Sequence, residues 1–444
     1  MAKFKFSLLI ALLLTALSVG AAQAGDKFIT VGWAAWDPAN ALMELSKDFT
    51  KETGIEVRGE FIPWPSFQER VFTELNAKGD NFDILIGDSQ WIGAGATYGH
   101  YVELTDFFKK TGIDLEKDFA PGPVYSYSTW PKGSKKYWAL PCEGDAVGWT
   151  YRKDWFAKPE LRKEFKKKYG YELDIPKDWV QLKQIAQFFQ GRVIDGQKVY
   201  GAAIYSKRAG DGITMGVTSA LYPWGVLYEN PKKPYDLDGY FNSKDAVDAL
   251  NFYKDFFDTA TPSGWGDAYM QEDLDAYTTG QVAMAMNFFA FFPGISKDPR
   301  VGKVTGYFAN PSMKTKGATL GGQGMSLVSY SKKQEMAKKF LQWFAREDVQ
   351  KKWWALGGYS CHKAVLDDPD FEKTAPYAKG FKESMLIVKD FWQEPTYAEL
   401  LDAAQREFHK FLVAGDISAQ QALDNIVKEW KQVFEDDGKY GKKK

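Results

Sequence analysis

The sequence predicts an α/β protein built of at least two lobes. The chain has 444 residues, which is more than the roughly 250 to 300 residues that one hydrophobic core usually organises. Hydrophobic residues make up 45% of the chain, enough apolar surface to fold such cores. Strand-like and helix-like segments alternate near the N-terminus, a pattern typical of α/β proteins with a parallel sheet.

The first residues are predicted to be a signal peptide. Lys3 and Lys5 precede an apolar stretch at 6–19, and Ala22 and Ala24 form a small-x-small cleavage site. The apolar stretch is shorter than the roughly 20 residues of a membrane-spanning helix. No cysteine lies at the cleavage point, so no lipid anchor is expected. We therefore assign residues 1–24 to the signal peptide and expect an exported, soluble protein, most simply periplasmic.

Two βαβ units follow. Strands are predicted at 28–32, 55–62 and 82–86, with helices at 39–52 and 66–78 between them. Leu42, Leu45 and Phe49 recur at helical spacing and give the first helix one apolar face. Successive βαβ units imply a parallel sheet with right-handed crossovers, and ligands of such sheets gather beyond the carboxyl ends of the strands.

Two stretches interrupt this alternation, and we interpret them as crossings between lobes. The first is at 140–145 and the second is the glycine-rich stretch at 319–325. Further strands are predicted at 146–151, 199–204, 281–287 and 303–308. Further helices are predicted at 179–190, 213–221, 244–258, 331–346, 397–413 and 418–435, and Ser331 is expected to cap the helix at 331–346.

The loops after the first three strands share an unusual composition. They cover residues 33–37, 63–67 and 87–91, each contains at least one tryptophan, and two also contain a carboxylate or an amide. A single tryptophan is most simply a core residue. Three such loops at one edge of a sheet favour a binding site instead.

Composition and motifs exclude several classes of function. Lys and Arg number 57 against 58 Asp and Glu, so the broad basic face of a nucleic-acid-binding protein is not expected. The chain has no G-x-S-x-G elbow, Walker A sequence or H-E-x-x-H motif. Its three histidines are scattered. We expect neither a metal nor a cofactor.

The residues that remain suit a hydroxyl-rich ligand. The apolar C–H face of a sugar ring stacks on an indole, carboxylates accept hydrogen bonds from hydroxyls, and amides both donate and accept. The candidates for hydroxyl binding are Asp37, Asp88, Gln90, Glu143, Asp145, Asn287 and Gln323, and those for stacking are Trp36, Trp64, Trp224, Trp265 and Trp392.

The two cysteines, Cys142 and Cys361, allow two interpretations. An exported protein meets an oxidising compartment, in which a disulfide is permitted. Two buried free thiols are the alternative, and the sequence pattern leaves both open.

Several segments together give the chain a family resemblance. It resembles the bacterial extracellular solute-binding proteins of ABC importers, in the carbohydrate branch that includes the maltodextrin-binding proteins. The matching segments are 49–57, 82–85 with Asp88 and Trp91, 140–145, 151–156, 280–284, 320–322 and 357–359. One departure is Ser360-Cys361-His362, which stands where this family often has Pro-x-Arg.

The resemblance implies two lobes, each a mostly parallel sheet flanked by helices, with the ligand in a cleft between them. The N-terminal lobe would comprise 25–141 plus 323–370, and the C-terminal lobe 145–320 plus 375–444. It also implies that Cys142 and Cys361 lie near each other, which favours a disulfide. With the chemistry above, the predicted substrate-binding set is Trp36, Asp37, Trp64, Phe67, Asp88, Ser89, Gln90, Glu143, Asp145, Trp224, Trp265, Asn287, Gly322, Gln323 and Tyr359.

The leading hypothesis is a monomeric periplasmic protein, not an enzyme, that binds a carbohydrate or polyol and delivers it to the permease of an ABC transporter. One alternative is a secreted glycoside hydrolase with Asp88 and Glu143 as its acid and base. The other is a binding protein for a quaternary ammonium solute held in an aromatic cage.

Overall fold

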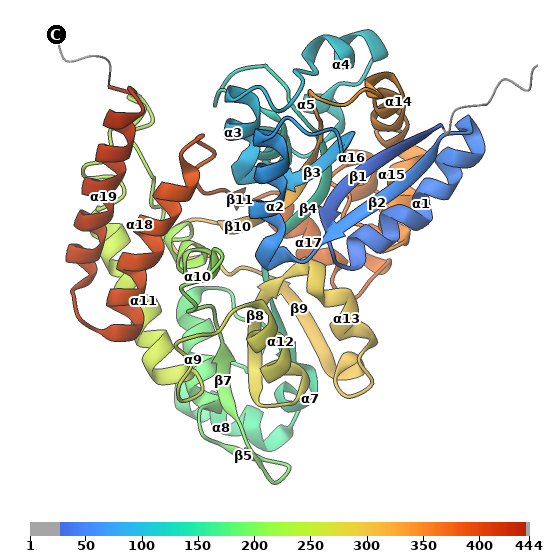
Figure 1. The fold of residues 1–444 in the computed structure, drawn as a ribbon. Helices are drawn as coiled ribbons and strands as arrows, with labels where there is room; N and C mark the ends of the chain where they lie inside the picture. Colours follow the sequence, from blue (N-terminus) through green and yellow to red (C-terminus); the bar gives the residue numbers. More distant parts are fainter. Residues whose placement is uncertain (1–26, 441–444) are drawn as a thin grey trace, which may run out of the picture.

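The computed structural model describes residues 27–440. The predicted signal peptide, residues 1–24, lies outside the described residues. No helix in the described part is long and apolar enough to cross a membrane. The ribbon divides into an N-terminal lobe around β1, β2 and β3 and a C-terminal lobe around β7, β8 and β9, with the long strands β4 and β10 running between them (Figure 1).

The N-terminal lobe begins with the two predicted βαβ units. Strand β1 pairs in parallel with β2 and with β3, which confirms the parallel sheet expected for this part. Pro38 lies in the first turn of α1, and Gly54 closes that helix in the left-handed conformation, at a φ of 71°. The elements are β1 (Phe28–Ala34), α1 (Asp37–Thr53), β2 (Glu56–Ile62), α2 (Trp64–Asn76) and β3 (Ile84–Asp88).

Short helices follow β3 in this lobe, and others follow β10, where the chain returns to the lobe. They are η1 (Ser89–Trp91), α3 (Ile92–Thr97), α4 (Thr105–Thr111), α5 (Leu115–Asp118), α6 (Pro121–Pro123), η2 (Val124–Ser128), α14 (Gln334–Phe344), α15 (Glu347–Ala355), α16 (Lys363–Leu366) and η5 (Phe371–Lys373). The next helix, α17 (Ala378–Met385), contacts β4 and β9. The predicted Ser331 cap is wrong, because α14 starts after Lys333. Ser331 instead donates its hydroxyl to the Asp83 carboxylate at 2.6 Å.

Two strands connect the lobes. They are β4 (Leu140–Arg152) and β10 (Ala318–Leu327), which pair with each other in antiparallel fashion. Strand β10 also runs antiparallel to β3, and β4 runs antiparallel to β8 and β9. The joined sheet has the order β2-β1-β3-β10-β4-β8-β7. The glycine-rich crossing is thus a strand, and its glycines let other groups approach its backbone.

The C-terminal lobe repeats the parallel arrangement on a smaller scale, because β7 and β8 pair in parallel. Its strands are β5 (Val193–Ile194), β6 (Gln197–Lys198), β7 (Tyr200–Ala203), β8 (Val282–Phe288) and β9 (Thr305–Ala309), and β11 (Val388–Lys389) pairs with β10. The helices are α7 (Lys153–Phe156), α8 (Pro159–Tyr169), α9 (Trp179–Phe189), α10 (Gly212–Leu221), α11 (Lys244–Ala260), α12 (Met270–Thr278), η3 (Phe289–Phe291), α13 (Phe292–Lys297), η4 (Gly302–Val304), α18 (Tyr397–His409), η6 (Lys410–Ala414) and α19 (Ala419–Asp436).

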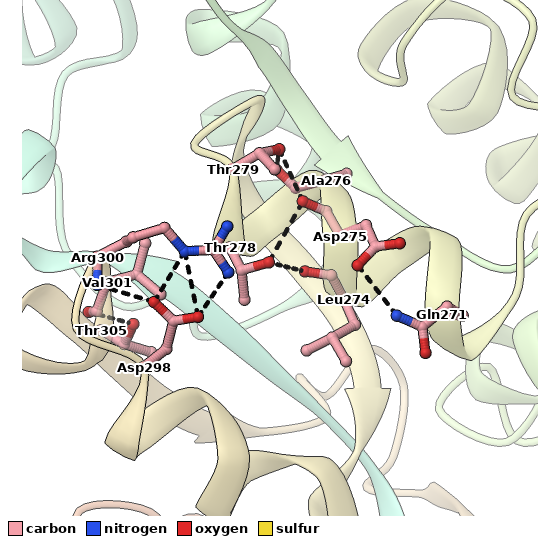
Figure 2. Close-up of polar contacts among 10 residues, drawn as sticks. All are labelled: Gln271, Leu274, Asp275, Ala276, Thr278, Thr279, Asp298, Arg300, Val301 and Thr305. Atoms are coloured by element: carbon pink, nitrogen blue, oxygen red, sulfur yellow. Dashed lines mark hydrogen bonds and ion pairs between the residues drawn. The ribbon is translucent and has the colours of Figure 1, made fainter.

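Helix α12 is fixed at the end that points away from its first residue, Met270. Thr278 and Thr279 donate their hydroxyls to carbonyl oxygens one turn earlier, at 2.9 and 2.7 Å (Figure 2). Near the start of the helix, Gln271 donates to the Asp275 carboxylate at 3.0 Å (Figure 2). Asp298 and Arg300 form an ion pair beside this end (Figure 2). The helix therefore presents its N-terminus from a firmly held base.

The buried apolar residues form two cores. The first gathers residues of β1, β3 and α1 with the helices after β10, for example Phe49 and Trp353, and continues past the crossing strands to Ala285 of β8 and Tyr307 of β9. The second contains Trp149, Trp179 and Trp430. The rings of Trp149 and Trp179 meet edge to face with centroids 6.0 Å apart, which is a favourable aromatic geometry.

Candidate ligand-binding cleft

A cleft with two adjoining chambers lies between the lobes. The inner chamber has a volume of about 160 Å³ and the outer one about 540 Å³. The inner chamber is lined by residues 34–36, Trp64, residues 88–90, Asp145, Asp211, Tyr269, Met270, Phe288, Phe291 and residues 320–323. Because both lobes and both crossing strands contribute, a ligand in this chamber would contact all of them.

The first wall of the cleft comes from the N-terminal lobe, at the carboxyl ends of β1, β2 and β3. Trp36 follows β1, Trp64 opens α2 after β2, and Asp88, Ser89 and Gln90 follow or end β3. This is the edge at which a parallel sheet places its ligand. The indole nitrogen of Trp36 is buried and has no hydrogen-bond partner among the described residues.

Trp64 is held by two aromatic neighbours. Its ring stacks on Trp91, with centroids 6.5 Å apart and an angle of 13° between the planes. Phe67 packs against both of them, with centroids 6.0 Å from Trp64 and 5.2 Å from Trp91. The exposed face of Trp64 is therefore a positioned platform in the cleft.

The second wall comes from the C-terminal lobe, from the loops that follow β7 and β8 and from the start of α12. Asp211 immediately precedes α10, Tyr269 and Met270 lie at the start of α12, and Phe288 and Phe291 lie at and after the end of β8. The Tyr269 hydroxyl donates a hydrogen bond to the Asp211 carboxylate. The strand-end geometry of the first wall is thus repeated in the second.

The crossing strands form the floor. Gln323 on β10 accepts a hydrogen bond from the Trp33 indole through its side-chain oxygen. Gly322 has a φ of 93°, and a Cβ atom there would lie 2.2 Å from the Tyr127 hydroxyl and 2.4 Å from the Glu143 carbonyl oxygen. Only glycine fits that conformation and that close approach.

The two carboxylates that face each other from opposite walls influence one another. Burial, followed by repulsion from Asp211, raises the pKa of Asp88 well above its usual range, against a hydrogen bond from the Gln90 amide at 2.9 Å. Burial also raises the pKa of Asp211, and the Tyr269 hydroxyl opposes this shift. Two acidic groups that share a desolvated space favour the protonated form of one of them.

A second acidic pair lies on β4. Burial raises the pKa of Asp145 to about 8, although the backbone amides of Ala146 and Ala290 donate to its carboxylate at 2.8 and 3.3 Å. Glu143 is fully buried, and neither carboxylate oxygen has a hydrogen-bond partner among the described residues. Burial and then Asp145 raise the pKa of Glu143. Within residues 27–440 no group of His, Cys, Asp and Glu is arranged to hold a metal ion.

Comparison with known proteins defines the family. Residues 35–351, well over half of the chain, match the family of bacterial extracellular solute-binding proteins. The chain belongs to this family. It is a solute-binding protein, and the family resemblance seen in its sequence is confirmed.

Relatives and solved structures agree with this assignment. A probable amino-acid ABC transporter periplasmic-binding protein of Sinorhizobium fredii is 22% identical over 76% of this chain and 73% of its own length. A ribitol complex of an ABC transporter solute-binding protein from Agrobacterium radiobacter K84 has a TM-score of 0.74 at 22% identity, covering 92% of this chain and 98% of that one. Maltose-bound MalE3 of T. maritima has a TM-score of 0.75 at 22% identity, covering 91% and 99%. The likeness confirms the two-lobed fold.

About half of the predicted site residues line the inner chamber of this solute-binding protein. They come from all three loops of the first wall and from both crossing strands, as the strand-end rule and the lobe-crossing interpretation predicted. They are Trp36, Trp64, Asp88, Ser89, Gln90, Asp145, Gly322 and Gln323.

Other predicted site residues lie in the cores or at the surface. Trp224 packs between Trp179 and Phe252 in the second core, with ring centroids 6.1 and 5.0 Å away. Phe67 is fully buried behind Trp64. Asp37 is exposed in the first turn of α1, where a carboxylate interacts favourably with the helix dipole.

Three more predicted site residues lie outside the chambers and form hydrogen bonds within the protein. Trp265 donates its indole N–H to the Ile204 carbonyl at 3.1 Å. Asn287 accepts from the Tyr205 hydroxyl at 2.8 Å and donates to the Met270 carbonyl at 3.0 Å, so it braces the second wall. Tyr359 donates to the Phe289 carbonyl and is buried.

Two further predicted residues are also outside the chambers. Glu143 lies opposite Gln323 in the β4–β10 ladder and is fully buried. Trp392, a predicted stacking residue, packs edge to face on Trp430 with centroids 5.5 Å apart. Tertiary packing, which a local pattern does not reveal, accounts for both.

Three residues of the second wall were not predicted from the sequence. Phe288 and Phe291 directly follow the predicted strand at 281–287, and Asp211 precedes the predicted helix at 213–221. The same strand-end rule, applied to these strands, points to them.

In the structure the two cysteines are free, buried thiols. Both lie in the core near Gly144, where an added Cβ atom would be 3.4 Å from the Cys361 sulfur. Burial raises the pKa of both thiols. The disulfide stays a prediction, and thiol labelling of the unfolded protein without reductant tests it.

Proposed function

We propose that this protein is the periplasmic substrate-binding component of an ABC importer and that it encloses a carbohydrate or polyol between its lobes. The observation that supports this most directly is the make-up of the inner chamber. Trp36 and Trp64 present aromatic faces to the same space as the polar groups of Asp88, Asp145 and Gln323. Such a chamber matches a ligand with apolar C–H faces and a rim of hydroxyls.

The cleft is less suited to an amino acid, although one relative is described as a probable amino-acid transporter component. An α-amino acid carries a carboxylate, which would find no lysine or arginine among the described residues that line the inner chamber. Lys207 lines the outer chamber, but its ammonium already lies 3.6 Å from both Asp267 and Glu272. Neutral hydroxyls need no such partner.

We also propose that the protein performs no catalysis. A glycoside hydrolase needs two carboxylates flanking the bond that is cleaved. Of the predicted pair, Asp88 lines the chamber, whereas Glu143 is fully buried outside it. A quaternary ammonium ligand is disfavoured as well, because its quaternary nitrogen cannot donate a hydrogen bond to Asp88 or Asp145.

Closure of the lobes would couple binding to transport. Residues 25–141 plus 323–370 would form one lobe and 145–320 plus 375–444 the other, and the core that contains Trp149 and Trp430 falls wholly within the second. A ligand that contacts both walls favours the closed state, which would dock on the permease in the membrane. The mature chain would begin at Gly25. It would act as a monomer and would not bind nucleic acid.

Intrinsic tryptophan fluorescence tests the proposal. The mature protein would be titrated with monosaccharides, oligosaccharides, polyols, amino acids and betaines, with thermal unfolding as a second readout. We expect a carbohydrate or polyol to shift both signals and to be recovered unchanged by chromatography. A response to amino acids or betaines alone, or conversion of the sugar, would contradict the proposal.

A further inference from the structure

The inner chamber carries acidic groups that no basic side chain neutralises. Asp88, Asp145 and Asp211 all line it. Among the described residues that line either chamber, Lys207 is the only lysine or arginine. Its ammonium is shared between Asp267 and Glu272, each 3.6 Å away. The three chamber carboxylates therefore face one another without a counter-charge.

Neighbouring acidic groups add to this cluster. Asp390 contributes to the repulsion that raises the pKa of Asp88, and Asp145 raises the pKa of Glu143. Lys132, which lowers the pKa of Asp390, is itself paired with Glu229 at 3.2 Å. Closing the lobes on a neutral ligand would keep these groups protonated or make their ionisation costly, whereas a cationic ligand would let them ionise.

Two hydrogen-bonding groups in the same chamber lack a partner that a ligand hydroxyl could supply. Gln90 is 5% exposed, lines both chambers and makes no side-chain hydrogen bond with the described residues. The buried indole N–H of Trp36 also lacks a partner there. Buried groups of this kind are normally satisfied, so a ligand that supplies acceptors and donors is expected.

We propose that the ligand is a hydroxyl-rich molecule bearing one protonated amine, that is, an amino sugar or amino-alditol, whose ammonium group sits between Asp88 and Asp211. An ammonium group has three donors and supplies the missing positive charge. Asp88 belongs to the first wall and Asp211 to the second, so the same group would hold the two lobes together. This inference rests on the proposed function and specifies its substrate class.

Other cations fit less well. A betaine cannot donate hydrogen bonds from its quaternary nitrogen, and its carboxylate would find no lysine or arginine among the described residues that line the inner chamber. An α-amino acid has the same carboxylate problem. A simple amine without hydroxyls would leave the Gln90 amide and the Trp36 indole N–H unpaired.

Isothermal titration calorimetry with matched ligands tests the inference. Each amine would be compared with its neutral parent and its N-acetyl form, using glucosamine, galactosamine, mannosamine and 1-amino-1-deoxysorbitol. The buffer would be near neutral pH, because a more acidic one would protonate Asp88 and Asp211, whose pKa values are raised. In at least one set we expect the amine to bind about tenfold or more tighter than both neutral forms, as a charged hydrogen bond to a desolvated carboxylate allows.

The possible results separate the two proposals. If neutral parents bind and no amine exceeds its parent, the inference is overturned while the proposed function stands. If no sugar or polyol, charged or neutral, binds in the panel, both are overturned. An N-acetyl form that binds as tightly as its amine also overturns the inference, because the group's size rather than its charge would then matter.

Asn variants locate the ammonium group. Asp211→Asn and Asp88→Asn keep an acceptor oxygen but remove the charge, so each should bring the affinity of the amine down to that of its neutral parent. Asp255→Asn is the matched control, since Asp255 lies on α11, is 50% exposed and pairs with Lys183; it should leave the ratio unchanged. Thermal unfolding checks that each variant folds. A ratio that survives in both cleft variants would overturn the assigned position.

Discussion

The two walls of the cleft reach similar geometry by different means. In the first wall, a backbone amide fixes the acidic group, because the Gln90 N–H donates to Asp88 at 2.9 Å. In the second wall, a side chain does so, because the Tyr269 hydroxyl donates to Asp211. The first wall is therefore set by the chain path after β3. The second depends on how its aromatic side chains pack.

The aromatic support differs in the same way. Trp64 lies nearly parallel to Trp91, at an angle of 13°. Tyr269 instead meets Tyr205 edge to face, with centroids 4.8 Å apart, and Tyr205 is held by Asn287. The first wall offers a flat platform, whereas the second offers a polar edge. We infer that the first contributes more stacking and the second more orientation.

Removing the platform is expected to have the largest effect. Trp64→Ala should weaken sugar or polyol binding by about 3 kcal/mol, or about 100-fold, which is within the range of buried aromatic anchors. Phe291→Ala removes a smaller ring from the second wall and should cost less. Fluorescence or calorimetric titration of both variants measures the difference. A larger loss for Phe291→Ala would place the platform in the second wall.

At Gly322, the floor between the walls leaves no room for a side chain. In Gly322→Ala the new Cβ would clash with the Tyr127 hydroxyl and the Glu143 carbonyl oxygen at a φ of 93°. The free energy of unfolding should fall by about 2 kcal/mol, measured by urea denaturation. Gly294→Ala is the control, because a Cβ there meets no atom within 4 Å. Equal stability of the two variants would contradict the close packing of the floor.

Site residues could be predicted from the sequence only where their positions followed a local rule. The loops with Trp36, Trp64 and Asp88 follow predicted strands, so the strand-end rule found them. Glu143 and Trp224 have the right chemistry, but long-range packing buries them, and no local pattern reveals that. The glycine-rich crossing proved to be strand β10, since its glycines admit neighbouring groups and do not mark a loop.

Asp145, between the walls, should make stability depend on pH. Its pKa is about 8 in the folded protein against an ordinary value of 3.8, so the native state holds an extra proton between these values. Stability contributed by the neutral form is fully present below the ordinary value and is lost as pH rises toward 8. Asp145→Asn should unfold at a higher temperature than the parent near pH 8, with a difference of at least about 1 kcal/mol that vanishes near pH 4. A difference independent of pH would contradict the raised pKa.

The smallest expected effect tests how the second wall holds its acidic group. Tyr269→Phe removes the hydroxyl that donates to Asp211 but keeps the ring against Tyr205. Ligand affinity should fall by about 0.5 to 1 kcal/mol, because a neutral hydrogen bond contributes about that much. Ser89→Ala is the matched change in the first wall, where the Ser89 hydroxyl is 3.5 Å from Asp88 and the backbone already fixes the carboxylate. We expect Ser89→Ala to change affinity less than Tyr269→Phe in parallel titrations. The opposite order would mean that side chains, and not the chain path, position both acidic groups.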